Sequence, residues 1–413
     1  MTEMGMDMES DNKTALDYAR LGCEAIMHRY SPKDLPPEGT LFYHQGVFLS
    51  GMMRLYHLTG EDKYFNYIKE YFDCAIGPKG EIYGIDHEIT DWMPEPSWRE
   101  GIKIKSLTML DCKQPVIIMY DLYDKTKDEK YLTAIKKISE SMYFWPVNSY
   151  GGYWHMMYEY DQMWLDGAYM AGPLSVMYSE RFDDPRLRDR AIKQIFIMNE
   201  HMMDKKTGLY YHGWDPLKKM EWADKKTGLS PQIWGRAVGW LAVAILDMLD
   251  HIPKSHPDVE RLKKIESELL CSIAKYRDKK TGMWFQVLDK PENPDNWIES
   301  SCNCLFIYSY AKAIEMGIIS NNEYSNIIKK AYDSLISTIY YEKDILTIDN
   351  ICTGTCIENG TYEYYINRSR TKNDLHGIGA FVLMCTEMQK YLNMFEPKET
   401  RGNDYRLKNC AAV

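Results

Sequence analysis

The chain of 413 residues lacks the features that would direct it to nucleic acid or into a membrane. It has no dense basic run, and its formal net charge is −10, so the composition excludes nucleic acid as a partner. No uninterrupted apolar stretch is long enough to span a bilayer. Residues 1–11 are acidic and lack the basic and apolar regions of a secretory signal. We therefore expect a cytoplasmic protein that does not insert into membranes.

Metal-type cysteine spacings and interdomain linkers are also lacking. Cys302-x-Cys304 and Cys352-x3-Cys356 have neither a second pair nor a histidine at zinc-binding spacing nearby. We expect no metal site and no organic cofactor. No low-complexity linker interrupts the chain, so we expect residues 1–413 to form a single domain with loosely packed ends.

Aromatic residues, by contrast, are abundant, with 32 Tyr and 11 Trp among the 13% that are aromatic. Tyr and Trp combine a flat apolar face with a polar edge, which suits both helix packing and sugar binding. Apolar residues make up 45% of the chain, enough for a large core. The sequence therefore permits a carbohydrate-binding protein with an extensive interior.

A short repeat marks turns along the chain. The motif Asp-Lys-Lys-Thr-Gly begins at Asp204, Asp224 and Asp278, and two of its copies run directly into aromatic residues. Asp and Gly favour tight turns, so we expect each copy to close a turn from which the next aromatic residue projects.

A longer alternation of helices defines the fold. Buried helices, which are apolar on nearly all faces, alternate with amphipathic helices that carry Lys and Glu. The buried ones are expected to begin near Tyr43, Asp111, Asp161, Trp234, Ser300 and Asn373, and the amphipathic ones to span 63–76, 130–142, 187–203, 259–276 and 324–339. Six such helical hairpins in a closed ring predict an all-α protein, an (α/α)6 barrel.

Parallel inner helices place all their N-termini at one end of the barrel, which we call the mouth. Unusual polar and aromatic residues fall at these N-termini or in the turns before them, and the anion-attracting helix ends point the same way. The candidates are His44, Asp111, His155, Trp164, Asp166, His212, Trp234, Arg236, Trp240 and His376.

Asp166 is the candidate with the fewest structural explanations. It is predicted to lie in the first turns of a strongly apolar helix, too far in to cap it, and a buried carboxylate is costly unless it has a use. The other candidates keep alternatives: Asp111 could cap a helix, Arg236 could pair with an internal acid, and the histidines could be satisfied turn residues.

Five segments carry a resemblance to a known family: Gly151-Gly-Tyr-Trp-His155, Gln162-Met-Trp-Leu-Asp-Gly-x-Tyr-Met-Ala-Gly-Pro173, Tyr211-His-Gly-Trp-Asp215, Trp234-Gly-Arg-x-x-Gly-Trp240 and Asn373-Asp-x-His-Gly-x-Gly-Ala-Phe381. In this order they resemble glycoside hydrolase family 105, the unsaturated rhamnogalacturonyl hydrolases, which are related to the family 88 unsaturated glucuronyl hydrolases. The resemblance runs from about His44 to about Tyr391 and implies an (α/α)6 barrel.

The resemblance also implies roles for individual residues. Asp166 would be the catalytic acid, and the positions lining the sugar site would be Asp111, His155, His212, Trp234, Arg236 and Trp240. The substrate would be a small oligosaccharide that carries a 4,5-unsaturated uronic acid, from a source such as pectin. We expect the segment that starts at Tyr43 and the loop from Trp92 to Trp98 to shape the site for the aglycone.

An unsaturated uronide permits an uncommon hydrolysis, because its C4=C5 bond is a vinyl ether. Protonation at C4 creates an oxocarbenium ion at C5, water adds there, and the resulting hemiketal opens and expels the aglycone. Burial and the nearby charge of Asp111 would raise the pKa of Asp166 and suit it to donate this proton. Asp166 would then accept a proton from the water.

Other functions remain open from the sequence. Asp111 and Asp166 could serve a conventional inverting glycosidase. His212 or His376 could be the base of an epimerase, and a non-catalytic sugar-binding protein is a further alternative. The sequence leaves the aglycone undefined, including whether the unsaturated unit is galacturonyl or glucuronyl, and permits a monomer or a homodimer.

Overall fold

The structure is a computed structural model that describes residues 13–37, 41–82, 86–88, 103–105, 108–157 and 159–395. The loop from Trp92 to Trp98, which we expect to shape the aglycone site, lies outside these residues. Among the helices of the described ranges, none combines the length and the apolarity needed to cross a membrane.

Six inner helices form a closed ring. Each contacts the next along the chain, and the last returns to the first. They are α2 (Tyr43–Thr59), α4 (Val116–Thr126), α6 (Gly167–Phe182), α8 (Gly235–His251), α10 (Ser300–Glu315) and α13 (Leu375–Phe395). In α8 nearly every side chain is buried, from Gly235 to Leu249, as expected of a helix surrounded by others. The predicted all-α (α/α)6 barrel is confirmed.

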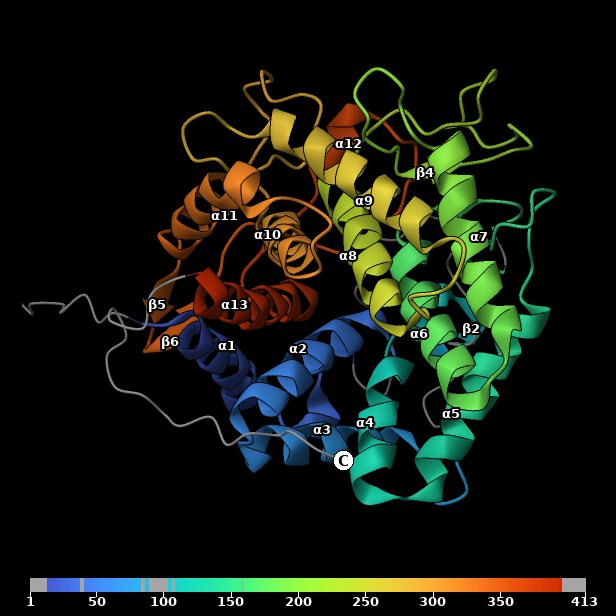
Figure 1. Cartoon of the computed structure of the whole chain (residues 1–413), viewed down its shortest axis with the longest axis vertical. Helices are drawn as coiled ribbons and strands as arrows, with labels where there is room; N and C mark the ends of the chain where they lie inside the picture. Colours follow the sequence, from blue (N-terminus) through green and yellow to red (C-terminus); the bar gives the residue numbers. More distant parts are fainter. Residues whose placement is uncertain are drawn as a thin grey trace, which may run out of the picture.

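Six outer helices cover the ring, each against an inner helix. They are α1 (Ala15–Arg29), α3 (Asp62–Ala75), α5 (Glu129–Ser141), α7 (Pro185–His201), α9 (Val259–Ile273) and α11 (Asn321–Ile336). Five agree with the predicted amphipathic segments within a few residues. The sixth, α1, had not been assigned from the sequence. In Figure 1 it lies beside α13, so the first helix covers the last inner helix and completes the ring.

Two inner helices begin later than predicted. Asp111 belongs to a short 3-10 turn, η3 (Leu110–Cys112), and α4 starts only after Pro115, because the residue before a proline disfavours the helical conformation. Residues 163–164 form a strand, β3 (Met163–Trp164), that pairs antiparallel with β4 (Gly213–Trp214), so α6 starts at Gly167. The predicted starts near Asp111 and Asp161 are therefore wrong by five or six residues.

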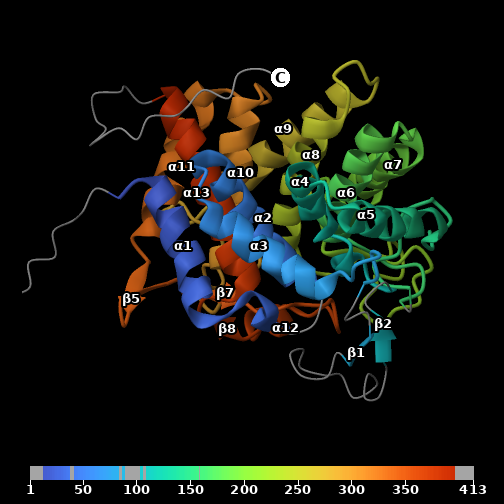
Figure 2. The same ribbon diagram turned by 90° about the horizontal axis from the view of Figure 1, so that it is seen from below.

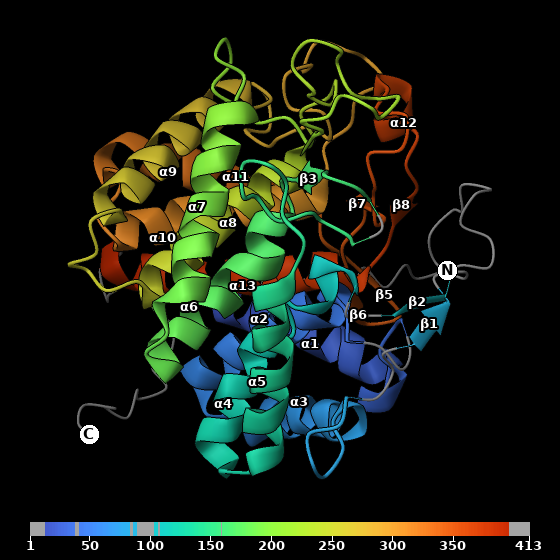
Figure 3. The same ribbon diagram turned by 90° about the vertical axis from the view of Figure 1, so that its right-hand side faces the viewer.

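Short strands and turns gather at one end of the helices. Figure 2 and Figure 3 show β7 (Ile351–Cys352), β8 (Arg370–Thr371) and α12 (Tyr362–Ile366) on the same side of the molecule. The remaining short elements are β1 (Asp86–Glu88), β2 (Lys103–Lys105), β5 (Tyr340–Glu342), β6 (Ile345–Thr347), η1 (Pro32–Asp34), η4 (Met142–Phe144) and η5 (Ala274–Tyr276). The connections at the mouth thus carry structure of their own.

The Asp-Lys-Lys-Thr-Gly repeats form the predicted turns. In the first copy, the Asp204 carboxylate accepts hydrogen bonds from the backbone N–H and the hydroxyl of Thr207, and Gly208 takes a positive φ of 74°. The other two copies repeat this arrangement at Asp224 and Asp278. After the first turn the chain leads directly to His212 and β4, so the repeat positions one wall of the mouth.

Candidate active site

Asp166 lies at the N-cap of α6 but does not cap it. Its side chain accepts no hydrogen bond from the first turn of the helix, although the residue is only 8% exposed. Glu299 occupies the same position before α10 and behaves differently, since its carboxylate accepts from the backbone N–H groups of Ser301, Cys302 and Cys352. The Glu299 carboxylate therefore caps its helix, whereas the Asp166 carboxylate makes no capping bond.

The pairing of β3 with β4 sets His212 against Asp166. Leu165 donates its backbone N–H to the carbonyl of His212 at 2.8 Å, and Nε2 of His212 lies 3.0 Å from Oδ2 of Asp166. On the other side of the ring, Nδ1 lies 2.6 Å from the hydroxyl of Tyr365 on α12. A tyrosine hydroxyl that donates to Nδ1 leaves the ring proton on Nε2, directed toward the carboxylate.

A second histidine–aspartate pair lies nearby. Nε2 of His155 is 3.0 Å from Oδ2 of Asp111, and the His155 ring stacks on Trp164 with ring centroids 4.6 Å apart. The segments approach through their backbones, because Leu110 donates to the carbonyl of His155 at 3.1 Å. The 3-10 turn around Asp111 is therefore docked directly on the segment that carries His155.

The two pairs differ in their protonation. Burial raises the pKa of Asp166, but interactions with His212, with His155 and with the backbone together lower it by more, so the net shift is downward. The expected raised pKa of Asp166 is therefore wrong for the free protein, because these partners together outweigh desolvation. Burial in turn lowers the pKa of His212. For His155, burial lowers the pKa, but the charge and hydrogen bond of Asp111, together with the charges of Asp166 and Glu159, raise it by more. Near neutral pH these directions describe an ionised Asp166 beside a neutral His212.

Arg236 lies behind the mouth rather than facing it. Its Nη1 and Nη2 atoms donate to the carbonyls of Cys352 and Thr353 at 2.6 and 2.7 Å, and its guanidinium lies over the Trp234 ring at 4.3 Å. Only Nε is a buried donor with no hydrogen-bond partner among the described residues. The two N–H donors with which a guanidinium could bind a carboxylate are thus already bonded to backbone carbonyls.

Trp240 forms a floor beneath the mouth. It is 1% exposed and stacks on Tyr169 with ring centroids 4.9 Å apart, while Tyr43 meets it edge-on at 6.5 Å. Its ring therefore packs against other aromatic side chains, and Tyr43 lies above it at the start of α2.

His44 and His376 converge on Asp374. Nδ1 of His376 lies 2.7 Å from Oδ1 of Asp374, and Nε2 of His44 lies 3.9 Å from the same atom. These three side chains offer ligand atoms within 4.8 Å of one another, the donor types of a transition-metal site. Burial lowers the pKa of His44 to about 3. The positive charge of Arg236 also lowers the pKa of both His44 and Asp374.

Five of the predicted residues line one cavity. It measures about 20 Å³, room for one water molecule, so a sugar ring requires its rim side chains to move. Its lining consists of Tyr43, Met109, Asp111, His155, Met156, Trp164, Asp166, Trp234, Thr355 and Cys356. Of the other candidates, His212 and Arg236 lie directly behind it, Trp240 lies beneath, and His44 and His376 lie beside it.

Of three further residues of this region, only Tyr365 was not indicated by the sequence, since Tyr43 lies in the segment expected to shape the aglycone site and Asp374 in the segment from Asn373 to Phe381. Tyr43, Tyr365 and Asp374 each contact a predicted residue, but Tyr365 is 153 positions from its partner His212. Asp374 and Tyr43 stand next to predicted inner-helix starts, which was the available signal. Nothing local in the sequence distinguishes Tyr365 from the tyrosines around it.

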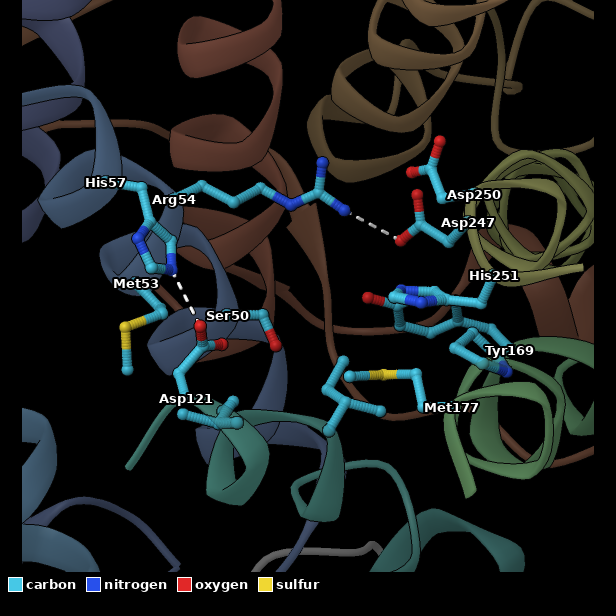
Figure 4. A pocket seen from close by; sticks show the side chains of 13 residues that line it. Ser50, Met53, Arg54, His57, Asp121, Tyr169, Met177, Asp247, Asp250 and His251 are labelled. Atoms are coloured by element: carbon cyan, nitrogen blue, oxygen red, sulfur yellow. Dashed lines mark hydrogen bonds and ion pairs between the residues drawn. The ribbon is translucent and has the colours of Figure 1, made fainter. Parts of the chain in front are cut away.

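A second pocket, of about 140 Å³, lies at the opposite end of the same inner helices. Figure 4 shows Arg54 reaching across it to Asp247, at 2.9 Å. Asp247 also accepts hydrogen bonds from the hydroxyl of Tyr308 and from Nζ of Lys312, both at 2.6 Å. We call this region the closed end of the barrel.

Comparison with known proteins fits this architecture. The profile of Glycosyl Hydrolase Family 88 matches residues 18–392. The unsaturated rhamnogalacturonyl hydrolase YesR of Bacillus subtilis is 22% identical over 326 residues, which cover 77% of this chain and 81% of that protein. A glycoside hydrolase of family 105 from C. acetobutylicum has a solved structure that superposes with a TM-score of 0.81 at 28% identity, covering 90% of this chain and 99% of that one.

An (α/α)6 barrel with paired carboxylates, histidines and tryptophans at its mouth defines a class of enzyme, the helical-barrel glycoside hydrolases. The chain belongs to Glycosyl Hydrolase Family 88, and it is similar to solved members of family 105. The protein is thus a hydrolase, which removes the epimerase and the non-catalytic sugar-binding protein from the alternatives.

Proposed function

We propose that the protein removes a 4,5-unsaturated uronic acid from the non-reducing end of small lyase-generated oligosaccharides. An unsaturated rhamnogalacturonan disaccharide is the substrate that we test first, because YesR is named for rhamnogalacturonyl hydrolysis. The observation that carries the proposal is the Asp166 side chain, which is buried, free of any capping role and 3.0 Å from a histidine.

Asp166 performs the first chemical step in this proposal. Its carboxyl transfers a proton to C4, the double bond becomes an oxocarbenium ion at C5, and water adds to C5. The water proton passes to the Asp166 carboxylate, which restores the acid. The hemiketal then opens: the C5–O5 ring bond breaks, C5 becomes a ketone, and O5 keeps a proton as the hydroxyl of a hemiacetal at C1. The hemiacetal collapses to an aldehyde as the C1–aglycone bond breaks, and its hydroxyl proton passes to the aglycone oxygen. One water is consumed overall, and no other reactant is needed.

Substrate binding would raise the pKa of Asp166, so that the carboxyl takes up a proton from solvent. Near neutral pH the carboxyl of the free protein is ionised, because His212 and its other partners lower its pKa despite burial. A bound uronate would remove the remaining water from Asp166 and bring a second negative charge close, and both effects raise a carboxyl pKa. The acid is therefore protonated in the complex, and the pH dependence of kcat reports a higher pKa than that of kcat/KM.

The other residues would hold the sugar. The acidic neighbours of His155, Asp111 first among them, raise its pKa despite burial, and its protonated form would attract the uronate. Trp164 and Trp234 line the cavity and offer aromatic faces to the ring. Tyr365 fixes the tautomer of His212 and so directs its Nε2–H toward Asp166. All these groups belong to one barrel, which we propose as the whole catalytic unit.

Ultraviolet absorbance tests the function directly. The conjugated C=C–carboxylate of the unsaturated disaccharide absorbs, and its keto product does not. We expect wild-type protein to remove this absorbance and Asp166→Asn to leave it. Glu299→Gln, which changes the carboxylate at the matching position of α10, controls for loss of fold and should keep activity in the folded fraction.

A conventional inverting glycosidase remains the second candidate, because two carboxylates, Asp111 and Asp166, line the same cavity. It would cleave a saturated uronide as well as the unsaturated one. Release of aglycone from the saturated disaccharide, measured as reducing sugar, would support this candidate and contradict hydration of the double bond.

A further inference from the structure

A third cavity, of about 250 Å³, opens beside the catalytic cavity, and we call it the side cavity. Consecutive parts of the chain line the two spaces. Tyr43 faces the catalytic cavity and His44 the side cavity, while Thr355 faces the former and Thr353 the latter. The segment from Thr353 to Thr355 therefore forms a wall between two adjacent cavities, and the side cavity lies next to the sugar proposed to bind at Asp166.

Two arginines fix this wall from opposite sides. Arg236 donates to the carbonyls of Cys352 and Thr353 from within the barrel. Arg368 donates to the carbonyl of Gly354 and, at 3.2 Å, to the hydroxyl of Thr355 from outside. Because both guanidiniums are committed to the wall, it is preformed and holds the side cavity open.

Charge is distributed unevenly within the side cavity. Asp374, on its lining, lies against His376 and His44 and is an acceptor suited to sugar hydroxyls. Two cations, Arg29 and Lys372, also line it. Lys372 is paired with Glu342 at 2.6 Å. Arg29 is exposed beside Tyr30, 5.0 Å from its ring, and makes no ion pair with any carboxylate of the described residues.

We propose that the side cavity binds the aglycone sugar of the substrate and that Arg29 recognises an anionic substituent on that sugar, either a sulfate ester or a carboxylate. This inference rests on the proposed function and extends it to the class of aglycone. A guanidinium offers two parallel N–H donors that match two oxygens of either group, which a neutral aglycone cannot use. Asp374 and His44 bind the hydroxyls of the same sugar.

Selectivity between matched substrates tests the proposal. Three disaccharides share one unsaturated uronyl unit and differ in the aglycone, which is a neutral rhamnose, a sulfated rhamnose or a uronate. We expect wild-type kcat/KM to be about tenfold higher for at least one charged aglycone than for the neutral one, as one charge-assisted contact supplies. Arg29→Gln should abolish this ratio, and high salt should reduce it.

The matched control is Arg186→Gln, which removes an exposed arginine of α7 that lines neither cavity and should keep the wild-type ratio. A preference for sulfate alone or uronate alone identifies which anion Arg29 binds. Equal kcat/KM for all three disaccharides, or a ratio that survives Arg29→Gln, overturns the proposal. If none of the three is consumed, the proposed function fails instead. Calorimetric binding of the free sulfated or uronate sugar to Asp166→Asn protein then still decides whether Arg29 holds an anion.

Discussion

The two ends of the barrel treat a buried carboxylate in opposite ways. At the closed end, Asp247 accepts hydrogen bonds from Arg54, Tyr308 and Lys312, so its charge is fully compensated. At the mouth, Oδ2 of Asp166 lies 3.0 Å from His212 Nε2, but neither atom makes a well-aligned hydrogen bond to any described group. The same inner helices carry both arrangements.

This difference separates structure from chemistry. A compensated carboxylate is held ionised and ties helices together. Burial alone would raise the pKa of Asp247, but Arg54, Lys312 and Tyr308 hold it far below its usual range. A buried carboxylate with fewer hydrogen-bond donors, such as Asp166, can exchange a proton with a ligand. Variants at the mouth should therefore lower activity, whereas variants at the closed end should lower stability.

The largest effect is expected from Asp166→Asn at the mouth. Loss of the proton donor should lower kcat by about 10²–10⁴-fold, the usual contribution of general acid catalysis. The melting temperature should stay near the wild-type value, because the side chain makes no capping bond. Kinetics by ultraviolet absorbance and a thermal melt measure both. A variant with near-normal kcat would remove Asp166 from the mechanism.

Asp247→Ala should show the reverse pattern at the closed end. Removal of one partner leaves Arg54 and Lys312 without their shared acceptor, which destabilises the fold by about 3–5 kcal/mol. The kcat of the folded fraction should stay close to wild type. Denaturant unfolding measures the change, with Asp250→Ala as the matched control, because Asp250 is half exposed and, among the described residues, forms an ion pair only with Lys312. Equal losses in both variants would contradict the distinction.

Tyr365→Phe should have a moderate effect at the mouth. Without the hydroxyl 2.6 Å from Nδ1, the tautomer of His212 is no longer fixed, and kcat should fall about tenfold, or by about 1.4 kcal/mol. The alkaline limb of the pH–kcat profile should also move, which a purely structural role would not produce. Tyr364→Phe is the control, since Tyr364 packs against Tyr365 without contacting His212. An unmoved pH profile would assign Tyr365 to packing alone.

The smallest effect concerns pH and the closed end. A hydrogen bond that protonated Glu315 donates to Glu387, together with burial, raises the pKa of Glu315 to about 7 from its usual 4.5. The folded state therefore holds this proton longer than the unfolded chain. The resulting stability is complete below about pH 4.5 and is lost as the pH rises toward 7. The pKa of Glu387 is lowered, so the stability that this carboxylate contributes is lost only as the pH falls below about 4.5.

Unfolding free energies between pH 5 and 8 measure this slope. Glu315→Gln should flatten it, because the amide stays a hydrogen-bond donor at every pH. Glu323→Gln, on the exposed face of α11, should leave the slope unchanged. A wild-type slope that survives in Glu315→Gln would place its origin elsewhere in the molecule.

Much of the barrel could be predicted because helix periodicity is a local property. The start of α2 at Tyr43 and the outer helix α9 from Val259 follow directly from apolar spacing. The start of α6 could not, because Met163 and Trp164 pair with a strand fifty residues away. Local apolar sequence fits a strand or a helix there, and only the partner decides between them.

The sequence by itself determined the alternation of buried and amphipathic helices, and therefore the barrel, its mouth and the presence of Asp166 there. Tertiary structure alone decided that Tyr365 holds His212, that two arginines clamp the wall beside the cavity, and that the pKa of Asp166 falls instead of rising. The physical reason is the separation along the chain over which each effect acts. Hydrophobic periodicity repeats within each helix, whereas hydrogen bonds and charge interactions depend on which distant groups the fold brings within a few ångströms.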